Sequence, residues 1–146
     1  MNSKLPSGTA ITILLVEDDD GDAKAVRRTF EKEKIANRIV RAIDGVEALE
    51  MLRGTNGREK IHPPYILLVD LNMPRMGGLD LLKAIRADEE LRGNVIFILS
   101  TSNREEDKKA AYDLNVAGYI VKERAGQDFL NVITLVDCYW RIVELP

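Results

Sequence analysis

The sequence predicts an α/β fold built on a parallel sheet, and three observations lead to that prediction. Short apolar runs alternate along the chain with segments of helical periodicity, in a β-α pattern that repeats five times. The residues from Tyr65 to Val69 form an unbroken apolar run before Asp70, which is typical of a strand buried on both faces. Strict alternation requires right-handed crossovers, and these place helices on both faces of a parallel sheet.

Apolar runs and turn residues set the expected elements. We expect strands at 10–16, 38–44, 65–70, 94–99 and 118–122. The expected helices cover 23–34 (capped by Asp20 or Asp22), 44–54, 78–91 (closed by Gly93), 103–115 and 127–145. Five strands in 146 residues fit a flavodoxin-like doubly wound (βα)5 sheet with the strand order 2-1-3-4-5.

Composition narrows the class of protein. At 146 residues with 45% hydrophobic and 31% charged residues, the chain is expected to form one globular domain over 11–146, after a flexible lead at 1–10. A net charge of -3 argues against nucleic-acid binding, and no apolar run approaches the roughly 18 residues of a membrane span. The lead lacks the apolar segment of a secretory signal, and a single cysteine suits a reducing compartment, so we expect a cytoplasmic location.

Polar side chains stand where four of the expected strands end. In a parallel sheet these ends share one edge, so the side chains are expected to converge there. They are Glu17 and Asp18 after the first strand, Asp70 at the third, Ser100 or Thr101 at the fourth, and Lys122 at the fifth.

This combination of groups predicts a site for a divalent cation and a phosphoryl group. Close carboxylates repel one another unless a cation lies between them, and carboxylates with water and phosphate oxygens suit Mg²⁺. Asp70 would be the nucleophile, since a carboxylate can form an acyl phosphate, and Lys122 and a hydroxyl would neutralise charge on the phosphoryl oxygens. Each group alone also has a structural interpretation: a helix cap, an Asx-turn, a strand-end hydroxyl or a surface lysine. Their joint placement favours the site.

The same residues resemble a known family. The segment from Asp70 to Gly78, Asp-Leu-Asn-Met-Pro-Arg-Met-Gly-Gly, looks like the D-x-x-M-P-x-M-x-G phosphoacceptor motif of two-component response regulator receiver domains. Residues 13–19 resemble the acidic segment after the first strand of that family, and residues 118–122 resemble its fifth strand with a terminal lysine. The resemblance covers roughly 11–145.

The resemblance implies a role for each matching residue. Asp70 would accept the phosphoryl group from the phosphohistidine of a histidine kinase, so the protein would be a phosphoacceptor and not a separate enzyme. Mg²⁺ would be bound by Asp18 and Asp70, by Glu17 through water, and by the backbone carbonyl of Asn72. The remaining roles are a counter-ion, a switch hydroxyl and an aromatic partner of that hydroxyl, which the resemblance gives to Lys122, to Ser100 (ahead of Thr101) and to Tyr119.

One position departs from the family pattern. Glu123 follows Lys122 where the family usually has proline, so a trans peptide or a rebuilt loop is expected there. Three features resemble the single-domain regulators paired with phytochrome photoreceptor kinases: this departure, the polar segment after the fourth strand, and residues 112–116.

The expected last helix is apolar over much of its circumference, which favours a second buried face. We therefore expect a homodimer formed by this helix and its C-terminal extension. The aromatic and aliphatic residues expected at that interface are Tyr139, Trp140, Ile142 and Leu145.

Two other functions remain open from the sequence. An Mg²⁺-dependent phosphatase or phosphotransferase would need a general acid-base group near its nucleophile, whereas Asn72 cannot titrate. A dimeric interaction module that works without phosphorylation would not need the complete set of carboxylates, hydroxyl and lysine. The phosphoacceptor is the function that the sequence favours.

Overall fold

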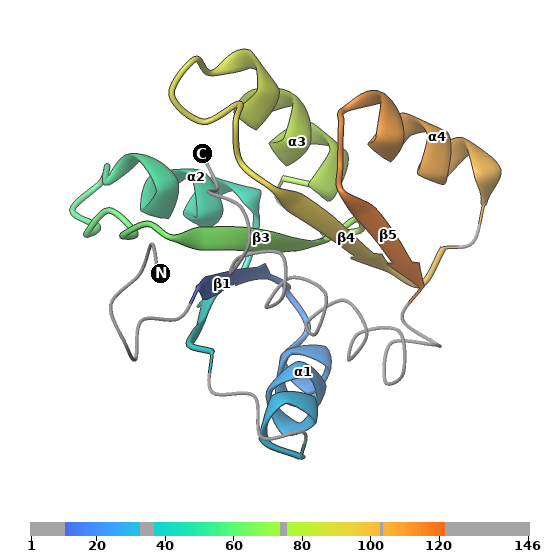
Figure 1. Cartoon of the computed structure of the whole chain (residues 1–146), viewed down its shortest axis with the longest axis horizontal. Helices are drawn as coiled ribbons and strands as arrows, with labels where there is room; N and C mark the ends of the chain where they lie inside the picture. Colours follow the sequence, from blue (N-terminus) through green and yellow to red (C-terminus); the bar gives the residue numbers. More distant parts are fainter. Residues whose placement is uncertain (1–10, 33–36, 74–75, 103, 122–146) are drawn as a thin grey trace, which may run out of the picture.

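The computed structural model contains a five-stranded sheet whose neighbouring strands are all parallel, in the order β2-β1-β3-β4-β5. Figure 1 shows helix α1 on one face of this sheet and helices α2, α3 and α4 on the other. The structure describes residues 11–32, 37–73, 76–102 and 104–121. The predicted fold and strand order are confirmed.

Strands and helices alternate along the described part of the chain. The strands are β1 (Thr12–Val16), β2 (Ile39–Ala42), β3 (Tyr65–Asp70), β4 (Ile96–Ser100) and β5 (Gly118–Val121). The helices are α1 (Asp20–Lys32), α2 (Gly45–Arg53), α3 (Gly78–Ala87) and α4 (Glu105–Asp113). No helix within these described ranges has the length and apolar character needed to cross a membrane.

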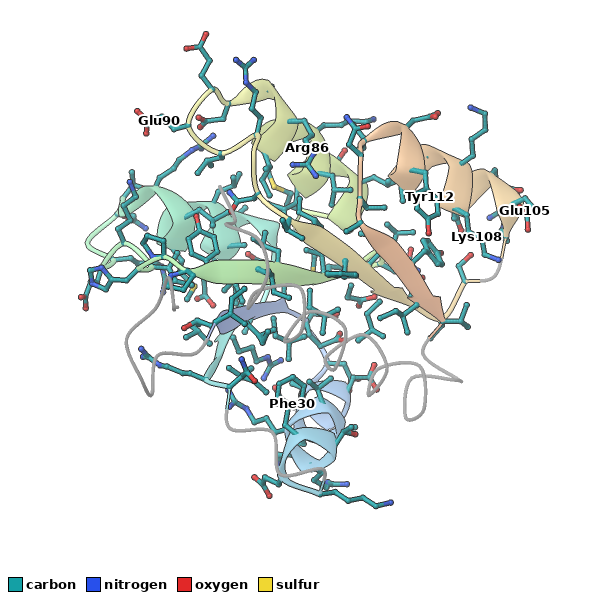
Figure 2. All side chains as sticks on the ribbon, viewed as in Figure 1. Phe30, Arg86, Glu90, Glu105, Lys108 and Tyr112 are labelled. Atoms are coloured by element: carbon teal, nitrogen blue, oxygen red, sulfur yellow. The ribbon has the colours of Figure 1, made fainter. Side chains whose placement is uncertain are left out.

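Alternate side chains of the central strands enter two separate apolar clusters, one on each face of the sheet. Leu15 and Leu68 pack toward α1 together with Val26 and Phe30, and Phe30 is labelled between that helix and the sheet in Figure 2. The next residues along the strands pack with α2 and α3 on the opposite face, as Val69 does. Burial of both faces explains the unbroken apolar runs in the sequence.

Helices α1, α3 and α4 differ at their ends from the predicted ones. Helix α1 begins at Asp20 instead of residue 23, and α4 covers Glu105–Asp113 instead of 103–115. Helix α1 is capped by Asp19, not by Asp20 or Asp22, because the Asp19 carboxylate accepts a hydrogen bond from the backbone N–H of Asp22 at 2.8 Å. Helix α3 ends at Ala87 instead of continuing to residue 91. The Asp88 side chain accepts the N–H of Glu90 at 2.9 Å and so forms an Asx-turn that ends the helix.

Several predictions lie outside the described residues. These are the counter-ion Lys122, the departure at Glu123, the helix at 127–145 and the interface residues Tyr139, Trp140, Ile142 and Leu145.

Candidate functional site

Three carboxylates meet at the carboxyl edge of the sheet, and we call Glu17, Asp18 and Asp70 the acidic cluster. One ligand oxygen from each residue lies within 4.8 Å of the other two. Strands β1 and β3 are neighbours, with Val16 paired to Val69, so the residues that follow these two positions are brought together. Glu17 is 0% exposed and Asp70 is 5% exposed, whereas Asp18 is open to solvent. Two carboxylates are therefore withdrawn from water beside a third that faces it.

Backbone hydrogen bonds and a neighbouring arginine hold the segment that carries Glu17 and Asp18. The N–H of Glu17 donates to the carbonyl of Ala42 at 3.0 Å and extends the β1–β2 ladder by one residue. The N–H of Asp19 donates to the Glu17 carboxylate at 3.3 Å. Arg41 donates to Asp20, and this hydrogen bond and positive charge hold the pKa of the Asp20 carboxyl below its usual range.

Asp70 is the last residue of β3, and α3 follows it in the chain. Its carboxylate accepts the backbone N–H of Asn72 at 3.4 Å, and the Asn72 residue is exposed. Gly78 donates its N–H to the carbonyl of Leu71 at 2.9 Å, and a Cβ at Gly78 would lie 2.6 Å from the Asp70 carbonyl oxygen. Only glycine fits so close to this backbone, which explains why glycine begins α3.

Ser100 lies at the end of β4, next to Asp70 in the sheet. Leu99 is the partner of Asp70 in the parallel register, so Ser100 is one residue further along the neighbouring strand. Ser100 is 0% exposed, whereas Thr101 is exposed. The Ser100 Oγ accepts the backbone N–H of Ser102 at 3.0 Å.

Tyr119 reaches the same loop from strand β5. Its hydroxyl donates to the carbonyl of Ser102 at 3.0 Å, so the Ser102 backbone contacts both Ser100 and Tyr119. The Ser102 hydroxyl also bonds to the carboxylate of Asp107 in α4. The two predicted switch residues, Ser100 and Tyr119, are thus joined through Ser102.

Sequence reasoning did not single out Arg41 or Ser102. Arg41 is an ordinary cation in an edge strand until its contacts are known, and the sequence carries no further signal for it. Ser102 was visible only as part of a polar segment after β4, and its backbone contacts have no sequence signature. Lys122 follows the last described residue of β5.

The donor set of the acidic cluster fits a hard divalent cation. All three groups are carboxylates, and oxygen ligands suit Mg²⁺ or Mn²⁺, whereas softer metals favour sulfur or imidazole. A divalent cation at this edge would offset the repulsion among the three carboxylates.

Comparison with known proteins identifies the class of protein to which this fold and the acidic cluster belong. The family model of the response regulator receiver domain matches residues 13–134. The chain therefore belongs to the response regulator receiver domain family of two-component signalling proteins.

Individual relatives include single regulators of similar length. The chain is 30% identical over 135 residues to the response regulator Rcp1 of Synechocystis sp. (strain ATCC 27184 / PCC 6803 / Kazusa), covering 92% of each chain. The Mn²⁺-bound form of Rcp1 superimposes with a TM-score of 0.76 at 30% identity, covering 94% of this chain and 99% of that one. The phosphorylated cyanobacterial phytochrome response regulator RcpA gives a TM-score of 0.79 at 29% identity, with the same coverage of both chains. The chain is thus related to phytochrome response regulators.

Proposed function

We propose that this protein is a phosphoacceptor switch in which Asp70 takes a phosphoryl group from the phosphohistidine of a histidine kinase. The observation that carries the proposal is the acidic cluster, in which a buried Asp70 lies with Glu17 and Asp18 within the span of a single ion. Asp70 is the group best placed to react, because it ends the central strand of the sheet and its carboxylate is oriented by the N–H of Asn72.

In this reaction, a carboxylate oxygen of Asp70 forms a bond to phosphorus while the phosphorus–nitrogen bond of the donor breaks. The electron pair of that bond stays on the imidazole nitrogen of the kinase, which takes up a proton from water. The cation would be Mg²⁺, bound by Asp18, Asp70 and the carbonyl of Asn72, with Glu17 contributing through water. When bound, it would offset the negative charge of the transferred phosphoryl group. Lys122 would supply a further positive charge from the sequence position after β5.

Ser100 would report the phosphoryl group to the rest of the molecule. Its burial beside Asp70 supports it over the exposed Thr101 as the switch hydroxyl. Its present hydrogen bond to Ser102, whose carbonyl binds the Tyr119 hydroxyl, supplies a route to β5.

Two partners complete the proposal. The relationship to Rcp1 and RcpA supports a phytochrome-type histidine kinase as the phosphoryl donor. A homodimer formed by the segment 127–145 rests on its apolar sequence alone, and sedimentation across the micromolar range tests it: a monomer throughout would refute the dimer.

The proposal is tested by incubating the protein with Mg²⁺ and acetyl phosphate and measuring its intact mass. We expect the mass of one added phosphoryl group on the wild type, and none with EDTA or in Asp70→Asn. Asp80→Asn is the matched control, because Asp80 is an exposed aspartate of α3 outside the acidic cluster, and it should still be modified. An equal adduct on Asp70→Asn, or no adduct on the wild type, would refute the assignment.

A further inference from the structure

Arg41 of strand β2 binds the segment that carries two members of the acidic cluster. Its Nε donates to the backbone carbonyl of Glu17 at 2.9 Å, and its Nη1 donates to the Asp20 carboxylate at 2.7 Å. The Arg41 side chain is only 20% exposed, although Asp20 itself is 81% exposed. Most of the arginine is therefore packed against the sheet edge, with two donors directed at residues on either side of Asp18.

These contacts attach the β1–α1 segment to the edge strand of the sheet. The Glu17 N–H donates to Ala42 of β2, and the Glu17 carbonyl accepts from Arg41, so both backbone groups of Glu17 are bound by neighbouring residues of β2. The guanidinium is a planar fork that holds two acceptors in a fixed relation, which a lysine ammonium cannot do. Asp18 lies within a four-residue span, from Glu17 to Asp20, that is held at both ends by the same side chain.

We propose that Arg41 is a positioning residue for the acidic cluster, which holds residues 17–20 so that the Glu17 and Asp18 carboxylates converge on Asp70 before a divalent cation binds. This inference rests on the proposed function, because it assigns Arg41 a role in building the Mg²⁺ site. Convergence of like charges is unfavourable in the apo protein, and the hydrogen bonds of Arg41 oppose the separation of these carboxylates.

The positive charge of Arg41 has the opposite effect on metal binding from its hydrogen bonds. A fixed cation beside an acidic cluster repels Mg²⁺, so removal of the charge alone would tighten Mg²⁺ binding. Loss of a residue that orients metal ligands instead weakens binding, typically by about tenfold or more. The sign of the change in Mg²⁺ affinity therefore distinguishes positioning from simple electrostatics.

The test compares Arg41→Met and Arg41→Lys with the wild type. The dissociation constant for Mn²⁺ is measured from the EPR signal of the free ion, and that for Mg²⁺ by competition. We expect both variants to bind Mg²⁺ about tenfold more weakly, since lysine keeps the charge but not the two-donor fork. Tighter binding by Arg41→Met with unchanged binding by Arg41→Lys would overturn the proposal in favour of electrostatics.

Stability and a control arginine complete the experiment. Urea unfolding in EDTA measures each variant without metal, and reduced stability with unchanged Mg²⁺ affinity would show that Arg41 is only structural, which overturns the proposal. Arg53→Met is the control, because Arg53 also forms an arginine–aspartate pair, with Asp88, away from the acidic cluster. Its Mg²⁺ affinity should stay unchanged, and an equal loss there would also overturn the proposal. A wild type that binds no Mg²⁺ would instead refute the proposed function.

Discussion

Gly45, the first residue of helix α2, is in contact with Met76, which precedes helix α3. The N–H of Gly45 donates to the Met76 carbonyl at 3.3 Å. A Cβ placed on Gly45 would lie 2.7 Å from Cγ and 2.8 Å from the sulfur of Met76. This close approach of Met76 to the first turn of α2 leaves no room for a side chain at residue 45.

Gly45→Ala is expected to destabilise the protein by about 1–3 kcal/mol, the usual result of overpacking a buried contact. Urea unfolding measures the change. In the Met76→Ala background, Gly45→Ala should reduce stability less than it does in the wild type, because truncation of Met76 makes room for the new methyl group. Additive losses in this double-mutant cycle would contradict the steric explanation.

The fold was predictable because burial on both faces leaves a plain pattern in the sequence. Strands β3 and β4 are apolar up to their last residue, and alternation with helices restricts the topology. The helix ends were less predictable, because they depend on local side-chain hydrogen bonds. Asp88 shows this: apolar spacing continues past it to Leu91, yet its Asx-turn ends α3 while Leu91 remains buried.

The acidic cluster was predictable for a related reason, since parallel strands bring their carboxyl ends to one edge. Asp70 and Glu17 could be placed together because one ends an expected parallel strand and the other directly follows one. The contacts of Arg41 and Ser102 could not be predicted in this way. They depend on the exact path of the loops and on backbone groups, which carry no residue preference.

Arg86 connects three parts of the chain and gives a prediction about stability. Its guanidinium donates to the carbonyls of Leu114, Asn115, Arg92 and Asn94 at 2.7–2.9 Å. Figure 2 labels Arg86 on helix α3, which carries it. Desolvation lowers its pKa from the ordinary arginine value, although the group stays charged.

Arg86→Met is expected to reduce the free energy of unfolding by about 3 kcal/mol, because several carbonyls lose a charged donor at once. Urea unfolding would measure this loss. The exposed Arg92 provides the control, and Arg92→Met should change stability by less than about 0.5 kcal/mol. Similar losses for both variants would show that the hydrogen bonds of Arg86 contribute little.

Tyr65 predicts a loss of stability at alkaline pH. Burial raises the pKa of its hydroxyl above the ordinary value, and this effect exceeds the opposing effect of a hydrogen bond with Asn94. The folded state therefore holds this proton more tightly than the unfolded state. The contribution is fully present below the unfolded pKa of about 10 and is lost as the pH rises through the higher folded pKa. Unfolding measured across this range should show a steeper fall in stability for the wild type than for Tyr65→Phe, and parallel curves would contradict the prediction.

Ser102 provides a direct reading of the proposed switch. Its backbone N–H donates to Ser100 Oγ, so movement of that hydroxyl toward a phosphoryl group on Asp70 would break the bond. In ¹H–¹⁵N spectra, we expect the Ser102 amide resonance to shift when the protein is phosphorylated. The Arg104 amide should follow, because it donates to the Ser102 hydroxyl at 3.2 Å. Ser100→Ala removes the acceptor beforehand, so phosphorylation of that variant should shift the Ser102 amide much less. A shift of equal size in both proteins would show that Ser100 is not the switch hydroxyl, and Thr101→Ala would then be the variant to compare.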